Sequence, residues 1–285
     1  MKRLTLFLAV LTTVAASPAL AADLDGTLKK IKSSKTITLG YHESARPFSF
    51  ANEGKPAGYS VDLCTLAAAG IGKQLGVSDL QVKWVKLTTE NRIQSVANGT
   101  VDHECGTTTV TLARSEQVDF SLMTFIDGAS LLVTDASGIR GVANVEGKRV
   151  AVIPGTTTEA RLAEALKKRN VTATIVSVKD HAAGVAALDE GKADAYASDR
   201  VILTGIGRTS KNPEKLSLLT EFFSYEPYGL VLRRGDSGFR LAVNRTLAEL
   251  YRSRDIVAIY EKWFGDMSTA APVIAAMYLI NGIPE

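Results

Sequence analysis

Residues 148–170, KRVAVIPGTTTEARLAEALKKRN, decide the fold, because a short apolar strand leads through Pro-Gly-Thr-Thr directly into a helical pattern. Thr156 and Glu159 have the T-x-x-E spacing of a capping box, which places a helix N-terminus at the end of the strand. Residues 173–199 then read as strand, helix and strand. Strands that alternate with helices in this way form a parallel sheet with helices on its faces.

The first half of the chain repeats this order of elements. Alternating apolar residues predict strands, and apolar residues at helical spacing predict a helix that ends at Gly76, a suitable C-terminal cap. The expected elements are strands at 36–42, 80–87 and 101–105, and helices at 58–76, 88–100 and roughly 111–117. The sequence therefore predicts a second α/β unit.

The two units are joined without a long linker. Residues 120–133 and 219–232 are apolar and extended in character, and they flank the unit that contains the capping box. The simplest arrangement inserts this unit into the first one, with two strands as a hinge near 126–131 and 222–228. We expect a first lobe over 22–127, an inserted second lobe over 128–226, and a return to the first lobe over 227–285. Residues 241–265 predict two amphipathic helices.

The N-terminus, MKRLTLFLAVLTTVAASPALA, has two basic residues, an apolar run and a small-residue ending. This pattern is typical of a secretory signal peptide, residues 1–21, cleaved after Ala21. A membrane anchor is the alternative, but the apolar run is shorter than the roughly 20 residues that a span needs. We therefore expect an exported, soluble protein.

The net charge of the chain bears on which ligands it can bind. The net charge is +3, and removal of Lys2 and Arg3 with the leader leaves it near +1. This balance does not favour nucleic acid as a ligand, because binding it requires a basic surface.

Cys64 and Cys105 are the two cysteines. They form either one disulfide, which an oxidising compartment permits, or two buried free thiols; neither has metal-ligand spacing.

A cluster of hydroxyl groups follows the strand expected at 101–105. Thr107 and Thr109 lie directly after it, Thr111 is placed to cap the next helix, and Arg114 lies in the first turn of that helix. A guanidinium matches the planar geometry of a carboxylate. The loop at Thr156 places hydroxyl groups at a strand end in the other half. Such loops meet beyond the carboxyl ends of the strands, where α/β proteins bind ligands.

These motifs resemble those of the periplasmic solute-binding proteins of ABC amino-acid importers, and within that group the glutamate/aspartate-binding branch. The resemblance rests on TITLGYHESARPFSF, GYSVDL, TTENRI, NGTVDHECGTTT, the RSEQVDFS segment, PGTTTEA, KDH and EKWF, which occur in the family's order over most of the mature chain. It implies the two-lobed type II periplasmic binding protein fold of α/β class, and a periplasmic location.

The resemblance also implies roles for individual residues. Arg114 and the hydroxyl loop of Thr107 and Thr109 match the family's α-carboxylate site. Thr156 matches the second-lobe threonine that closes on the same carboxylate, and Asp199 matches the acid that binds the ammonium.

Selectivity for an acidic side chain is implied by a further set of positions. Arg92 and Thr89 match the side-chain subsite of the acidic-amino-acid branch, and His181 matches a histidine that reaches the site. One position departs from the family, because His42 stands where the acidic binders carry an arginine. Either Arg46 replaces that charge or a protonated His42 does so. Glu104 has no place in this scheme beyond structural hydrogen bonding.

The expected function is capture of a free amino acid, glutamate or aspartate first, and its delivery to a membrane permease by a monomer without cofactor or metal. A broad-specificity amino-acid binder and a ligand-sensing module are alternatives. A third alternative is an enzyme that resembles the cyclohexadienyl dehydratases, with Glu104, His42 or His181 as proton donor.

Overall fold

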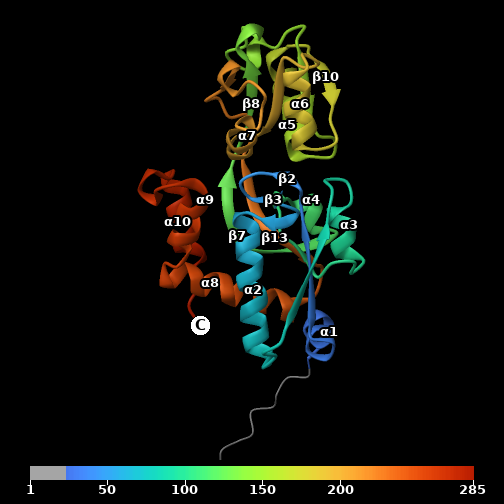
Figure 1. Cartoon of the computed structure of the whole chain (residues 1–285), viewed down its shortest axis with the longest axis vertical. Coiled ribbons are helices and arrows are strands. Elements are labelled where there is room, and N and C mark those ends of the chain that lie inside the picture. Colours follow the sequence, from blue (N-terminus) through green and yellow to red (C-terminus); the bar gives the residue numbers. More distant parts are fainter. Residues whose placement is uncertain (1–23) are drawn as a thin grey trace, which may run out of the picture.

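The structure is a computed structural model that describes residues 24–285, so the leader expected at 1–21 lies outside the described residues. Figure 1 shows two α/β lobes stacked along the long axis of the molecule and joined by strands. Over residues 24–285, no helix is long and apolar enough to cross a membrane.

The first lobe is built on a five-stranded sheet of order β5-β1-β6-β13-β7. Strand β1 (Thr36–Tyr41) pairs in parallel with β5 (Gln81–Lys86) and β6 (His103–Glu104), as the alternating pattern predicted. Strand β13 (Glu226–Arg233) runs antiparallel to β6 and to β7 (Val118–Asp127). A small sheet contains β2 (Ser44–Ala45), β3 (Ser49–Asn52) and β4 (Lys55–Ala57). The helices are α1 (Gly26–Ser34), α2 (Tyr59–Leu75), α3 (Arg92–Ala97), α4 (Leu112–Ser115), α8 (Ser237–Ser253), α9 (Ile256–Phe264) and α10 (Pro272–Asn281), with the 3-10 turn η4 (Met267–Thr269).

The second lobe is built on a separate sheet of order β10-β9-β11-β8-β12. Strands β9 (Arg149–Val152), β10 (Thr174–Ser177) and β11 (Ala195–Asp199) are parallel, whereas β8 (Ala129–Thr134) and β12 (Leu216–Leu218) join it antiparallel. Its helices are α5 (Thr157–Arg169), α6 (His181–Asp189) and α7 (Arg200–Gly207), with 3-10 turns η1 (Asp135–Ser137), η2 (Val142–Asn144) and η3 (Pro213–Lys215). The parallel sheet flanked by helices, expected from the capping-box stretch, is confirmed.

Two crossings connect the lobes. The chain leaves the first sheet at Asp127 and joins the second at Ala129, and it returns to the first sheet at Glu226. Residues 219–225, expected to be extended, belong to no strand. The N–H groups of Leu219 and Phe223 nevertheless donate to carbonyl groups of β8 at 3.0 Å, so part of this segment still follows the second sheet.

An aromatic cluster anchors the first-lobe side of the hinge. Phe125 of β7 lies opposite Tyr228 of β13, and the ring of Phe48 lies 4.9 Å and 5.4 Å from their ring centroids. All three side chains are buried. Burial of aromatic side chains contributes strongly to stability. We therefore expect bending between the lobes to occur at the crossings rather than within this cluster.

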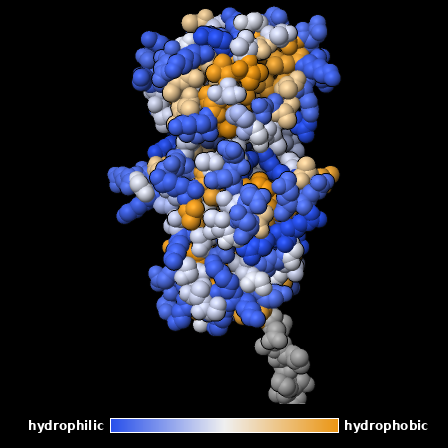
Figure 2. Space-filling model, turned by 90° about the vertical axis from the view of Figure 1, so that its right-hand side faces the viewer, coloured by the Kyte–Doolittle hydropathy of each residue, from blue (hydrophilic) through white to orange (hydrophobic). Residues whose placement is uncertain are grey.

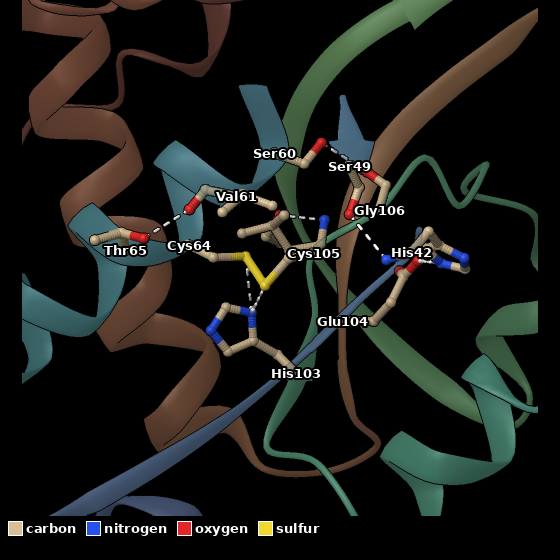
Figure 3. The surroundings of a disulfide bond; sticks show 12 residues. His42, Ser49, Ser60, Val61, Cys64, Thr65, His103, Glu104, Cys105 and Gly106 are labelled. Atoms are coloured by element: carbon tan, nitrogen blue, oxygen red, sulfur yellow. Dashed lines mark hydrogen bonds and ion pairs between the residues drawn. A yellow bond between two sulfur atoms is a disulfide. The ribbon is translucent and has the colours of Figure 1, made fainter. Parts of the chain in front are cut away.

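The cysteines form a disulfide, which decides between the two alternatives that the sequence left open. Cys64 of α2 bonds to Cys105, which follows β6, with their Cα atoms 6.0 Å apart (Figure 3). Nδ1 of the buried His103 lies 3.5 Å from Sγ of Cys64. The bond ties the long helix to the strand end from which the threonine loop begins.

Candidate functional site

A cavity of about 590 Å³ lies between the lobes, lined by residues of both. Nine of the ten expected site residues line it: His42, Thr89, Arg92, Thr107, Thr109, Arg114, Thr156, His181 and Asp199. The side view in Figure 2 shows hydrophilic residues at the level where the lobes meet, and a hydrophobic group on the face of the upper, second lobe. The cavity is shared between the lobes, and hydroxyl, cationic and carboxylate side chains are among those that line it.

The threonine loop and α4 hold Arg114 at the first-lobe side of the cavity. Thr111 caps α4 as expected, since its Oγ1 accepts a hydrogen bond from the N–H of Arg114 at 3.1 Å. Nη1 of Arg114 donates to the carbonyl oxygen of Thr109 at 2.8 Å. Burial lowers the pKa of Arg114, but the group remains a cation. The geometry holds a guanidinium beside the threonine hydroxyl groups.

Arg92 begins α3 and is buried beside the same loop. Its Nε donates to Oγ1 of Thr108 at 2.9 Å, and its Nη1 donates to the carbonyl oxygen of Thr89. Burial lowers the pKa of Arg92 to about 10, and repulsion from Arg114 contributes. Arg92 therefore stays charged at neutral pH.

The second lobe contributes hydroxyl groups from the N-terminus of α5. Oγ1 of Thr156 accepts from the N–H of Glu159 at 3.1 Å and donates to the carbonyl oxygen of Ile153 at 2.8 Å. Only half of the predicted capping box is formed, because Thr156 caps the helix but the carboxylate of Glu159 accepts from the N–H of Gly155 rather than from that of Thr156. The hydroxyl of Thr156 is occupied in the helix cap. The hydroxyl groups of its neighbours Thr157 and Thr158 instead donate to residues outside the loop, Glu226 and Asp199.

Asp199 lies at the end of β11 and is buried. Its carboxylate accepts hydrogen bonds from the hydroxyl of Thr158 at 3.1 Å and from that of Tyr228. Burial raises the pKa of Asp199 well above its ordinary value, and the nearby carboxyl groups of Asp127 and Glu226 add to the shift. A cation that entered the cavity would favour its charged form.

His181 opens α6, where Asp180 is the N-cap. Its Nδ1 lies 2.8 Å from the hydroxyl of Tyr196. Burial lowers the pKa of His181 to about 3, with the positive charges of His42 and Arg92 contributing. His181 is therefore a neutral hydrogen-bonding group rather than a cation.

His42 and Arg46, the two residues expected to replace the arginine of the acidic-amino-acid binders, lie in different places. His42 lines the cavity, and its Nε2 lies 2.8 Å from Oε1 of Glu104 (Figure 3). Arg46 is not among the residues that line the cavity, because its guanidinium lies over the ring of Phe50, 3.8 Å from the centroid. Of the two, only His42 is in position.

Three contributors were missed from the sequence: Thr157, Thr158 and Glu226. Glu226, at the start of β13, is buried, and its Oε2 accepts from the hydroxyl of Thr109 at 2.6 Å and from that of Thr157 at 2.7 Å. It therefore joins the two threonine loops across the hinge. The repeated threonines of PGTTTEA pointed to Thr157 and Thr158, whereas Glu226 looked like the start of an ordinary apolar strand.

A family model for the bacterial extracellular solute-binding proteins, family 3, matches residues 37–266. The chain belongs to this family. An L-glutamate/L-aspartate-binding protein of Pseudomonas aeruginosa is 36% identical over 258 residues, which cover 90% of this chain and 85% of that protein. A glutamate/aspartate import solute-binding protein of Escherichia coli is 35% identical over 250 residues, 87% of this chain and 82% of that protein.

The fold of this family 3 member also matches solved structures. One is an ancestral amino-acid-binding protein, a precursor of cyclohexadienyl dehydratase, with a TM-score of 0.72, 28% identity and coverage of 84% of this chain and 100% of that chain. The chain has the type II periplasmic binding protein fold that the resemblance implied. Its relatives are transport binding proteins.

Proposed function

We propose that this protein captures an acidic L-amino acid, glutamate or aspartate, between its lobes and delivers it to the permease of an ABC importer. The main support for this proposal is that Arg114 and Asp199 line one cavity from opposite lobes. A guanidinium suits the α-carboxylate and a carboxylate suits the ammonium, so the pair matches a zwitterion. The names of the two relatives support glutamate and aspartate as ligands.

The mechanism is closure of the lobes on the ligand. Arg114, Arg92 and the Thr107–Thr109 loop would hold it on the first lobe. The Thr156–Thr158 loop, His181 and Asp199 would hold it on the second. A ligand held by both lobes stabilises the closed form by its differential affinity for that form. The protein would act as a periplasmic monomer, released from its leader after Ala21, and would need no cofactor and no nucleic acid.

Calorimetric titration with the twenty amino acids tests this function. Glutamate or aspartate should bind most tightly, and Arg114→Ala should weaken every amino acid that binds by roughly 10- to 100-fold, because charged hydrogen bonds are lost. Arg161→Ala is the matched control, since Arg161 pairs with Glu164 on the exposed face of α5. No binding of any amino acid, or equal binding by the Arg114 and Arg161 variants, would reject the proposal.

A dehydratase is the second candidate, favoured by the ancestral precursor structure and by the His42–Glu104 pair. Glu104 has no exposed surface, so it could pass a proton to a substrate only through His42. Incubation with prephenate or arogenate, followed by detection of an aromatic product, decides between this activity and binding alone. The proposed function predicts no product.

A further inference from the structure

Glu104 is a buried carboxylate next to the cavity. Its Oε1 accepts from the hydroxyl of Thr108 at 3.1 Å and lies 2.8 Å from Nε2 of His42, while Oε2 has no partner among residues 24–285. Thr108 in turn accepts from Nε of Arg92. Arg92, Thr108, Glu104 and His42 therefore form one hydrogen-bonded chain that ends at the cavity.

The charges of this chain decide what the cavity accepts. Arg114 and Asp199 match the zwitterion common to all amino acids, so a side-chain carboxylate must be matched by other groups. The positive charge of Arg92 and the negative charge of Glu104 offset each other through Thr108. With His42 neutral the chain has no net charge, which suits a side-chain amide. With His42 protonated it carries one positive charge, which suits a carboxylate.

The hydrogen-bonding pattern of His42 leads to the same distinction. Because Nε2 faces the carboxylate of Glu104, it carries a proton and donates in both states. Nδ1, which has no hydrogen-bond partner within the described part of the chain, changes its role. It is an acceptor when the ring is neutral and a donor when the ring is protonated. An amide can donate to the first form, and a carboxylate can accept from the second.

We propose that His42, positioned by Glu104, couples ligand choice to a proton: the cavity takes glutamate or aspartate with His42 protonated and glutamine or asparagine with His42 neutral. This inference rests on the proposed function. Binding of the acidic ligand takes up one proton at His42, and the proton returns to solvent when the ligand leaves.

Several charged and titratable groups surround His42. Glu104 of β6 contacts the ring of His42, and Arg92 of α3 lines the same side of the cavity. Lys179, Asp180 and His181 line the second-lobe side. The neighbouring Glu43 pairs with Lys86 at 2.6 Å on the surface. The chain has three histidines. Burial lowers the pKa of His103 to about 4 and that of His181 to about 3, so neither titrates near neutrality.

Burial raises the pKa of Asp127 to about 7, so Asp127 titrates near neutrality. It lies at the hinge near Asp199, which would hold the ammonium, so its titration affects all amino acids alike. The ratio of the glutamate and glutamine affinities therefore isolates His42. The side-chain carboxyl of free glutamate, with a pKa of about 4.3, stays ionised above about pH 5.5.

The test is calorimetric titration of the full mature chain with L-glutamate and L-glutamine between about pH 5.5 and about pH 8, the range in which histidines titrate. The glutamate-to-glutamine affinity ratio should fall about tenfold or more as pH rises, as expected for a coupling of one pKa unit or more. In His42→Gln the glutamate-to-glutamine affinity ratio should be low and independent of pH. In His42→Arg the ratio should be high and independent of pH, since arginine keeps its charge. Glu104→Gln should make the ratio independent of pH as well, while Asp127→Asn should leave the slope of the ratio intact.

A flat ratio in the wild-type protein, or a slope that persists in His42→Gln, would overturn the proton coupling while leaving amino-acid capture in place. Failure of both ligands to bind at any pH would overturn the proposed function and this inference with it. Titration in buffers of different ionisation enthalpy gives a second readout. It should detect proton uptake with glutamate and none with glutamine.

Discussion

Arg92 lines the cavity, and only some of its guanidinium N–H groups are hydrogen-bonded to the protein. Nε and Nη1 donate to Thr108 and Thr89, and Nη2 has no hydrogen-bond partner among residues 24–285. Its buried position lowers the dielectric around it and strengthens any pairing with a ligand carboxylate. The side chain is thus held rigidly by the protein while one amino group remains for a ligand.

Arg92→Ala should therefore weaken glutamate by roughly 10- to 100-fold and glutamine much less, because only glutamate loses a charged hydrogen bond. Calorimetry with both ligands on the same preparation measures the difference, and Arg161→Ala provides the control. Equal losses for glutamate and glutamine would contradict a role for Arg92 in side-chain recognition.

Part of the lining of the cavity was predicted from residue types and spacing. Arg114 and Thr156 were found because hydroxyl-rich loops follow two strand ends, and strand ends of an α/β sheet meet at one edge. Asp199 was implied by the resemblance to the solute-binding family alone. Glu226 was missed because its partners, Thr109 and Thr157, are 117 and 69 residues away in the chain. The position of Arg46 was not predictable either, since its stacking on Phe50 depends on how the small sheet folds.

Among the elements, capping residues predicted a helix end as well as helix starts, since Gly76 is the C-cap of α2 as expected. Thr111 and Thr156 cap α4 and α5 as expected. Helices α8 and α9 confirm the two amphipathic helices expected over 241–265. Helix α10 was not predicted, because PVIAAMYLIN is apolar nearly throughout and shows little helical periodicity. The pairing of Cys64 with Cys105 also required the tertiary fold.

The disulfide should contribute substantially to stability, because it closes a loop with a sequence separation of 41. Loss of such a cross-link costs about 2–4 kcal/mol, chiefly through the greater entropy of the unfolded chain. Urea unfolding of the Cys64→Ser, Cys105→Ser double variant should show this loss against the oxidised wild type. The reduced wild type, unfolded in the presence of a thiol, is the second comparison. An unchanged free energy of unfolding would contradict the assignment.

For the molecule as a whole, the hinge is notable for a concentration of acidic groups, Asp127, Asp199 and Glu226. Burial raises the pKa values of Asp127 and Asp199, and the nearby carboxyl group of Glu226 adds to both shifts. Oε1 of Glu226 lacks a partner within residues 24–285. Asp127 accepts from the N–H groups of Gly128 and Val201, so it links the first crossing to α7. The ammonium of a ligand beside Asp199 would favour the charged form of this carboxyl group.

This arrangement predicts a pH dependence of stability. Burial raises the pKa of Asp127 to about 7, so the folded state holds its proton more tightly than the unfolded chain does. The free energy of unfolding of the ligand-free protein should fall by about 2 kcal/mol through this group between about pH 5 and about pH 7. Chemical unfolding should show a shallower fall for Asp127→Asn. Parallel pH profiles for the two proteins would contradict the prediction.

A crystal structure of the protein grown with L-glutamate would show whether one amino acid bridges the two lobes. We predict the α-carboxylate within hydrogen-bond distance of the Arg114 guanidinium and the ammonium against the Asp199 carboxylate, with Arg92 near the side-chain carboxylate. Glutamate bound elsewhere, or an empty cavity at saturating glutamate, would contradict the account.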